Sequence, residues 1–269
     1  MPNIIKKIIF FFVGASISLN IWNNDDLDNK KHIINKTPKG EEVIVLEDIK
    51  IGRNRIIQPN YTSTTGWWTY PNEIKLTKRN GDDLLVLVNK EYRLSEKYAP
   101  NDLVPASNSG IRRGAGFKLR NIIIGDLKEL VEQAKNDGID LSIRSGYRSY
   151  QDQLTTYNHW VRVNKNSTDD ADKISARAGH SQHQLGTAVD FSSAEIQDGI
   201  GGRFHTTKAS AWLAENAWKY GFVISFPKGY ESTTGYSYES WHYRYIGRAN
   251  AQEMRSRGDI LEIYLRGKN

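Results

Sequence analysis

The sequence contains no cysteine among its 269 residues. This absence excludes disulfide bonds, zinc sites with thiolate ligands, a thiol nucleophile and a lipid anchor on an N-terminal cysteine. A metal site in this chain must therefore use imidazole and carboxylate groups, which are the other common protein ligands of zinc.

The sequence also lacks an apolar run of the ~20 residues that a membrane-spanning helix needs. The basic pair Lys6-Lys7 precedes a shorter apolar stretch from Ile8 to Ala15, followed by small residues. This order is typical of a secretory signal peptide. We predict a signal peptide or an uncleaved membrane anchor in residues 1–22, and hence an extracytoplasmic protein whose only membrane contact is this segment, if it is uncleaved.

A nucleic-acid-binding motif is missing as well, because neither a basic helix nor an aromatic-studded RNA-binding motif occurs. The formal net charge is +6, and 38% of the residues are hydrophobic and 25% charged, as in soluble globular proteins. The basic excess suits an anionic partner. We do not expect nucleic acid to be that partner.

Two imidazoles and two carboxylates stand out in two separate segments. His183 and Asp190 lie in the first, and Glu239 and His242 in the second. Catalytic zinc usually takes three nitrogen or oxygen ligands and leaves a fourth position for water, and a carboxylate beside that water can act as general base. His183, Asp190 and His242 fit the ligands and Glu239 fits the base, although Asp190 and Glu239 could exchange roles.

The spacing around these residues predicts local structure. Val189-Asp190-Phe191 and the alternating run from Trp241 to Ile246 are typical of strands. In a regular strand an offset of three places Glu239 and His242 on opposite faces. If both face one metal, Glu239 must lie on a loop or bulge before the strand.

The order of these residues resembles the zinc D-alanyl-D-alanine carboxypeptidases of the VanY type. Their superfamily also contains D,D-dipeptidases, L,D-carboxypeptidases and phage endolysins. The likeness covers roughly residues 85 to 250 and is carried by several motifs in order: Leu87-Val88-Asn89-Lys90, Tyr98-x-Pro100-x-Asp102-Leu103-Val104, Ser145-Gly146-Tyr147-Arg148-Ser149 through Gln153, Ser181-x-His183-x-x-Gly186-x-Ala188-x-Asp190, Trp212 to Ala217, Tyr220-Gly221-Phe222, Ser225-x-Pro227 and Glu239-x-Trp241-His242.

The resemblance implies a zinc site made of His183, Asp190 and His242, with Glu239 as general base. The implied reaction is that of a D,D-carboxypeptidase, which hydrolyses the C-terminal D-Ala of peptidoglycan stem peptides. The implied partners are the stem peptide and the anionic cell wall. The implied location is the wall or the outer face of the cytoplasmic membrane.

The resemblance also implies roles for residues beyond the metal site. It favours Arg148 over Arg144 as the cation that stabilises developing negative charge or binds a substrate carbonyl or carboxylate. It implies further substrate contacts from Tyr147, Gln153 and Ser181 beside that of Arg148. It places His180 in the cleft wall.

Alternative functions stay open. An L,D-carboxypeptidase or a phage-type endopeptidase would share the zinc site. A serine D,D-peptidase would need Ser-x-x-Lys with a later Lys-Thr-Gly; Ser225-Phe226-Pro227-Lys228 matches the first pattern, but no Lys-Thr-Gly follows. A non-catalytic wall-binding module would not need an intact set of two histidines, one aspartate and one glutamate.

Helical and strand periods interleave without a strict βαβ rhythm, which predicts an α+β fold. We expect a single zinc-peptidase domain over 85–269, with a small mixed or antiparallel sheet flanked by helices, after a linker and N-terminal extension over 23–84. The Asn80-Gly81 pair predicts a hairpin between 73–77 and 84–88. Helices are predicted at 117–137, 150–163, 210–220 and 250–257, a tail at 260–265, and strands at 43–46, 141–143, 189–191, 222–226 and 241–246.

Overall fold

The computed structural model describes residues 7–13, 16–22, 32–36, 42–46 and 68–269. The chain divides into two compact units, Met1–Ile56 and Ile57–Asn269. The first unit contains two antiparallel strand pairs: β1 (Lys7–Val13) with β2 (Ser16–Trp22), and β3 (His32–Lys36) with β4 (Glu42–Leu46). The strand predicted at 43–46 lies within β4, and residues 47–67 of the predicted extension lie outside the described residues. Among the described helices, none combines the length and apolarity needed to cross a membrane.

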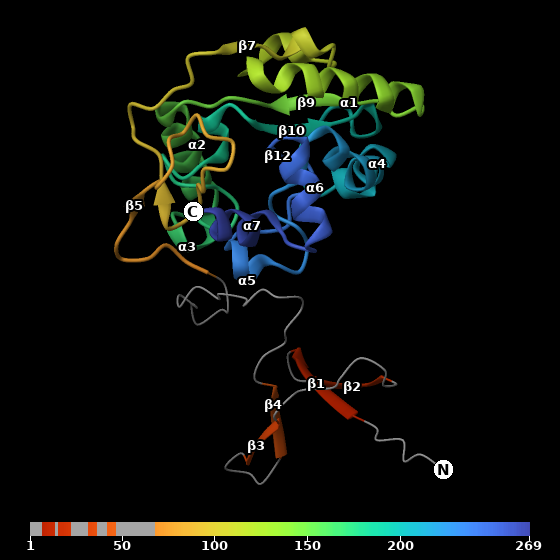
Figure 1. Ribbon diagram of the computed structural model, residues 1–269. Helices are drawn as coiled ribbons and strands as arrows, with labels where there is room; N and C mark the ends of the chain where they lie inside the picture. The colour runs from red at the N-terminus through yellow and green to blue at the C-terminus, as the bar shows by residue number, and fades with distance from the viewer. Residues whose placement is uncertain (1–6, 14–15, 23–31, 37–41, 47–67) are drawn as a thin grey trace. The chain divides into compact units, whose positions relative to one another are not determined.

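A four-stranded antiparallel sheet organises the second unit (Figure 1). Its strand order is β11–β12–β10–β9, with β9 at Ser142–Ser145, β10 at Ala188–Ser192, β11 at Phe222–Ile224 and β12 at His242–Tyr245. Each of these strands lies at or within two residues of the position that the sequence predicts. The sheet is antiparallel throughout.

The register of this sheet places three polar residues in one row. Asp190 on β10 lies directly opposite His242 on β12 and opposite Ser145 on β9. Because side chains alternate along a strand, Val189 and Phe191 point to the other face, where both are fully buried in the main core. One face of β10 is therefore part of the core, and the other carries Asp190.

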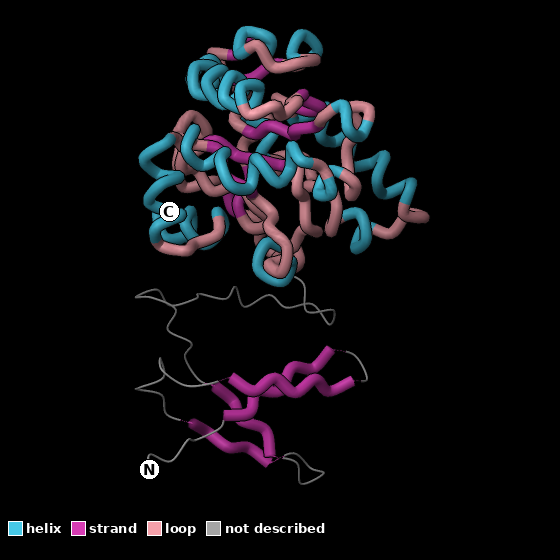
Figure 2. The backbone as a smooth tube through the Cα atoms, turned by 90° about the vertical axis from the view of Figure 1, so that its right-hand side faces the viewer, coloured by secondary structure: helices cyan, strands magenta, loops and turns pink. Residues whose placement is uncertain are grey.

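Helices surround this sheet, as the tube view also shows (Figure 2). Helix α1 covers the core face with Leu127, Leu130 and Ala134, each of which is fully buried. The helices are α1 (Ile124–Asn136), α2 (Tyr150–Val163), α3 (Thr168–Ala171), α4 (Lys208–Asn216), α5 (Glu231–Thr234), α6 (Arg248–Ser256) and α7 (Leu261–Lys268). The architecture is the expected α+β fold, with a small sheet flanked by helices.

The first predicted helix begins later than its apolar period suggested. Residues 118–120 form β8 (Lys118–Arg120), which pairs antiparallel with β7 (Leu103–Pro105). Leu119 is buried like the apolar residues of α1, but it reaches the core from a strand. Periodicity within one segment could not reveal the pairing with a segment fifteen residues upstream. The end of the helix agrees with the prediction, since Gly138 follows it with a φ of +75°.

The predicted hairpin at Asn80-Gly81 is wrong. Strand β5 (Lys75–Leu76) pairs in parallel with β6 (Tyr92–Arg93), and residues 84–88 form no strand. Local turns take the backbone donors that a hairpin would use. The Asp83 N–H donates to the Asn80 carbonyl oxygen at 3.0 Å, and the Asp83 side chain accepts the Leu85 N–H at 2.8 Å.

At Gly146 the backbone after β9 packs closely against β8. A Cβ added there would lie 2.6 Å from the Lys118 carbonyl oxygen, which is backbone and cannot rotate away. We expect Gly146→Ala to lower the free energy of unfolding by about 1–3 kcal/mol through overpacking, measured by urea denaturation. Gly125→Ala in α1 is the matched control, because nothing lies within 4 Å of the added Cβ, and it should not destabilise. Equal stability of the two variants would contradict this account.

Candidate active site

Three of the predicted residues converge on one buried point. Asp190 Oδ2 lies 3.2 Å from His183 Nε2, and Asp190 Oδ1 lies 2.9 Å from His242 Nδ1. One ligand atom from each of the three residues lies within 4.8 Å of the others, and all three side chains are at least 94% buried. His183 comes from the 3-10 turn η4 (Gln182–Leu185), and the other two come from the adjacent strands β10 and β12.

The loop after β9 fixes the orientation of His183. His183 Nδ1 lies 2.6 Å from the Gly146 carbonyl oxygen. Because a carbonyl only accepts, Nδ1 carries the proton and Nε2 presents its lone pair to the cluster. A second bond joins the loop after β9 to the turn that carries His183, because the Arg148 N–H donates to the His183 carbonyl oxygen at 3.2 Å.

Gln182 helps to fix the orientation of the His242 ring, on the side away from Asp190. His242 Nε2 lies 3.2 Å from Gln182 Oε1, which also accepts the Ser225 hydroxyl at 2.7 Å. Gln182 therefore contacts the ring at Nε2, and Nδ1 faces Asp190 Oδ1 at 2.9 Å. The ring of Phe226 packs against His242 at a centroid distance of 5.1 Å and limits its movement.

The charges of this cluster fit a metal cation. Burial raises the pKa of the Asp190 carboxyl, but the His183 and His242 imidazoles beside it outweigh burial and hold that pKa well below its usual range. Burial lowers the pKa of His242, which favours its neutral form. The ionised carboxylate therefore faces His183 Nε2 and His242 Nδ1, and a cation held among these three atoms would be matched by the charge of Asp190. The two nitrogens and one oxygen suit zinc.

Glu239 lies beside this cluster on a loop. Its Oε2 is 3.9 Å from His242 Nδ1, and its backbone carbonyl oxygen accepts the His242 N–H at 3.3 Å. The turn lets both side chains face one point despite their offset of three, as the spacing predicts. Burial, together with the Asp190 carboxylate, raises the pKa of the Glu239 carboxyl well above its usual range, and Arg148 opposes this rise.

Arg148 lies in the same cavity, and its guanidinium is held by two neutral groups. It donates to Gln153 Oε1 at 2.9 Å and to Ser145 Oγ at 3.0 Å. Gln153 in turn donates to the Ala176 carbonyl oxygen at 2.6 Å. Neither partner of the guanidinium is anionic, so its charge stays available to the cavity. Arg144, in contrast, is exposed and does not line the cavity.

The other predicted residues differ in their position. Ser181 lines the cavity, and its hydroxyl accepts the His183 N–H at 3.2 Å, so it caps the turn that carries His183. Gln153 lines the cavity but uses its amide to hold Arg148. His180 also lines the cavity, and burial lowers its pKa to about 4. Tyr147 is half-buried and lies outside the cavity lining.

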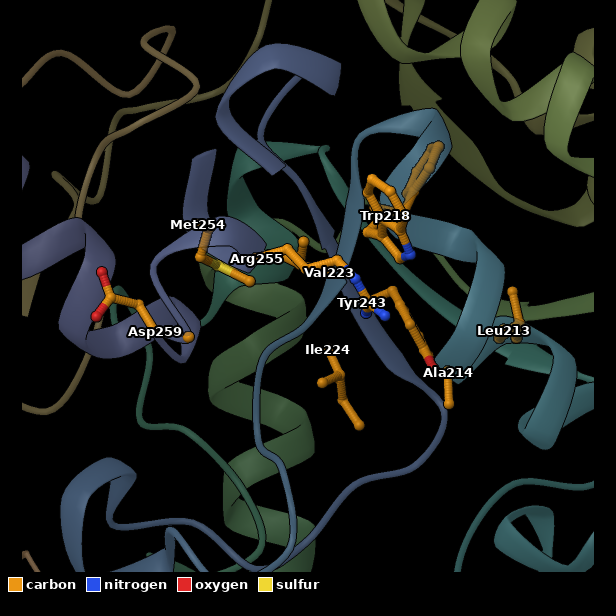
Figure 3. A pocket seen from close by; sticks show the side chains of 11 residues that line it. Leu213, Ala214, Trp218, Val223, Ile224, Tyr243, Met254, Arg255 and Asp259 are labelled. Carbon is orange, nitrogen blue, oxygen red and sulfur yellow. The ribbon is translucent and has the colours of Figure 1, made fainter. Parts of the chain in front are cut away.

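The cavity that contains the cluster has a volume of about 420 Å³. Another hollow, of about 480 Å³, lies among α4, β11 and α6, where Trp218, Met254 and Arg255 line it (Figure 3). None of the predicted site residues borders that second hollow. The chemistry predicted from the sequence therefore belongs to the first cavity, which we call the catalytic cleft.

Comparison with known proteins identifies the family. Residues 116–248 match the family model described as VanY: D-alanyl-D-alanine carboxypeptidase. The putative carboxypeptidase YodJ of Bacillus subtilis is 35% identical over 202 residues, which cover 72% of this chain and 73% of YodJ. This chain belongs to the VanY family.

Solved structures of related enzymes share the fold of this VanY-family protein. The LD-carboxypeptidase LdcB superimposes with a TM-score of 0.64 at 34% identity, covering 73% of this chain and 94% of LdcB. The vancomycin resistance D,D-pentapeptidase VanY in complex with Zn(II) superimposes with a TM-score of 0.57 at 30% identity, covering 67% of this chain and 98% of that one.

A network behind the catalytic cleft was not predicted, and part of it precedes the residues that match the VanY model. The Tyr70 hydroxyl accepts the Arg177 N–H at 2.9 Å and lies 3.1 Å from the Tyr236 hydroxyl. Lys90 is 1% exposed, and its Nζ lies 5.0 and 4.6 Å from the ring centroids of Tyr70 and Tyr236. Lys90 also donates to the Asp172 carbonyl oxygen at 2.9 Å, and burial lowers its pKa to about 8. We call these five residues the Tyr70 network.

The Tyr70 network supports the loop that carries Glu239. The Tyr236 ring packs on Phe226 at a centroid distance of 4.9 Å. The Phe226 carbonyl oxygen accepts the Glu239 N–H at 3.1 Å, and the Phe226 ring contacts His242. Nothing in the sequence near Tyr70 indicated this role, because both of its hydroxyl partners lie more than 100 residues away.

We expect Tyr70→Phe to reduce both stability and turnover. The change leaves the Arg177 N–H and the Tyr236 hydroxyl without a partner, which should cost about 1–2 kcal/mol of unfolding free energy, and it loosens the support of Glu239. Tyr264→Phe is the matched control, since that hydroxyl also has two partners, Asn250 and Glu253, in the C-terminal helices. Denaturation and turnover measured on both variants should show similar destabilisation but a loss of turnover in Tyr70→Phe alone.

Proposed function

We propose that this protein is a zinc-dependent D,D-carboxypeptidase that removes the C-terminal D-Ala of peptidoglycan stem peptides. The observation that carries the proposal is the buried cluster of His183, Asp190 and His242, with the Glu239 carboxylate 3.9 Å from one of its imidazoles. Membership of the VanY family supports the same conclusion.

The residues of the cleft divide the chemistry among them. A zinc ion held by His183, Asp190 and His242 would act as a Lewis acid that polarises the scissile carbonyl and lowers the pKa of the attacking water. The Glu239 carboxylate takes the proton of that water and delivers it to the leaving amine. The Arg148 guanidinium faces the negative charge that develops on the carbonyl oxygen, or the carboxylate at the end of the substrate.

The assignment of Asp190 as ligand and Glu239 as base rests on their contacts. Asp190 contacts both imidazoles at 3.2 Å or less, whereas Glu239 approaches one of them at 3.9 Å. The raised pKa of the Glu239 carboxyl also suits a group that must hold a proton briefly before passing it on. The exchange of roles that the sequence left open is therefore the weaker assignment.

A second candidate is an L,D-carboxypeptidase. The likeness to LdcB, with a TM-score of 0.64, favours it. The two activities differ in the residue before the scissile bond, because a D,D-enzyme converts a pentapeptide stem to a tetrapeptide and an L,D-enzyme converts a tetrapeptide to a tripeptide.

Mass spectrometry of the products from defined stem peptides tests the proposal. The purified protein is incubated separately with tri-, tetra- and pentapeptide stems and with cross-linked stem dimers. We expect the pentapeptide to lose one D-Ala and the tripeptide to stay intact. Conversion of the tetrapeptide alone would assign L,D activity instead, and cleavage only within cross-linked dimers would assign an endopeptidase. Intact substrates in every reaction would refute a peptidase function.

Metal content provides an independent prediction. A site with three protein ligands should hold about one zinc per chain, measured by atomic emission on the purified protein. Chelation should abolish hydrolysis, and added zinc should restore it. His183→Ala should lose both zinc and activity. Full activity in the chelated protein would rule out the mechanism.

Glu239→Gln should separate proton transfer from metal binding. The amide keeps the shape of the side chain but cannot accept a proton, so turnover should fall by about 10²–10⁴-fold while zinc content is unchanged. Asp190→Asn is the comparison and should lose zinc, because it removes a charged ligand. The reverse pattern, with zinc lost from Glu239→Gln and retained in Asp190→Asn, would exchange the two roles.

A further inference from the structure

Exposed apolar side chains gather at the mouth of the catalytic cleft. Within residues 68–269, seven large hydrophobic residues are exposed, and three of these, Trp160, Ile174 and Ile200, line this one cavity. Their exposed fractions are 36%, 37% and 50%. Exposed apolar groups that gather in one place usually mark a binding surface. We call these three residues the apolar rim.

The rim comes from three separate segments. Trp160 lies on α2, Ile174 follows α3, and Ile200 lies in the loop after β10. A contact made by all three therefore depends on the tertiary fold and not on one apolar stretch of sequence.

The loop that carries Ile200 is firmly anchored, so the exposure of this side chain belongs to a fixed structure. Asp198, two residues earlier, accepts the Ser142 hydroxyl at 2.8 Å and an Arg112 N–H at 2.6 Å. The Asp198 N–H also donates to the Ser193 carbonyl oxygen at 3.0 Å. These bonds tie the loop to β9 and to its own beginning.

Helix α2 sets the distance from Gln153, which holds Arg148, to Trp160 of the rim. It turns Gln153, Thr156 and Trp160 toward the cleft, with the offsets of three and four that put residues on one helical face. Gln153 holds Arg148, and Trp160 lies seven residues further along the helix. Seven residues correspond to about 10 Å at a rise of ~1.5 Å each, which is the length of about three extended peptide residues.

We infer that the apolar rim is a substrate-binding subsite for the part of the stem peptide upstream of the bond that is cut. The same cavity contains the catalytic groups and the rim, so a chain bound for hydrolysis that continues along α2 must pass the rim. The Trp160 ring and the two isoleucine side chains bury methyl and methylene groups of the substrate there. This inference rests on the proposed function and adds that substrate length determines affinity.

A series of substrates of increasing length tests the subsite. Hydrolysis is measured for an N-acylated D-Ala-D-Ala dipeptide, for the free pentapeptide stem and for the disaccharide pentapeptide. In the unaltered protein we expect KM to fall as the substrate lengthens. In Trp160→Ala, KM for the two long substrates should rise about ten-fold, equivalent to about 1.4 kcal/mol of binding free energy. The kcat values of all three substrates and the KM of the dipeptide should not change.

Ile200→Ala should act in the same direction on the long substrates. Ile122→Ala is its matched control, because that isoleucine is also 50% exposed and does not line the cleft. Ile122→Ala should leave kcat and KM unchanged for all three substrates. Because these side chains are exposed, we expect each variant to retain the fold. Thermal unfolding of each variant checks this expectation.

The outcomes separate this inference from the proposed function. Hydrolysis of all three substrates with no selective effect of Trp160→Ala or Ile200→Ala would overturn the subsite and leave the carboxypeptidase proposal standing. Binding of the unaltered protein but not of Trp160→Ala to phosphatidylglycerol vesicles in a co-sedimentation assay, with unchanged kinetics on the soluble substrates, would overturn it in favour of a membrane contact. An unaltered protein that hydrolyses none of the three would refute both.

Discussion

The pairing of β10 with strands on both of its sides is the constraint on which the catalytic cleft depends. Asp190 stands directly opposite His242 on one neighbour and Ser145 on the other, so one row across the sheet supplies two ligand groups and a partner of Arg148. Because side chains alternate along a strand, a slip of one residue would turn Asp190 into the core and Phe191 toward the cleft. The apolar face that packs against α1 therefore protects the geometry of the polar face.

The other proposed catalytic groups lie outside the strands, but main-chain bonds attach their segments to neighbouring segments. The carbonyl oxygen of Phe226 fixes the Glu239 backbone, and the Tyr70 network holds the adjoining Tyr236. Glu239 lies near the C-terminal end of the segment that matches the family model. Its support thus includes Tyr70, which lies far upstream of the start of that segment. The contacts that hold the Glu239 loop therefore include residues that the family model does not cover.

The convergence of the proposed metal ligands could be predicted because their residue types and spacing carry the information locally. His183, Asp190 and His242 lie within short motifs, and the bounds of α2 follow from its cap at Ser149 and its amphipathic period. The predicted hairpin failed because Asp83 redirects the local backbone donors, and the first helix was drawn too long because β7 pairs with β8. Gln182 and Tyr70 were missed since their partners are brought to them only by tertiary folding. No pattern within a single segment records such contacts.

The bond between His183 and the Gly146 carbonyl oxygen has a consequence for how this protein can evolve. The group that selects the tautomer of a proposed ligand belongs to the main chain, and every amino acid supplies the same carbonyl. Point mutation cannot delete this acceptor; it can only displace it. A substitution at position 146 therefore leaves the proton on His183 Nδ1 in place as long as the backbone keeps its path.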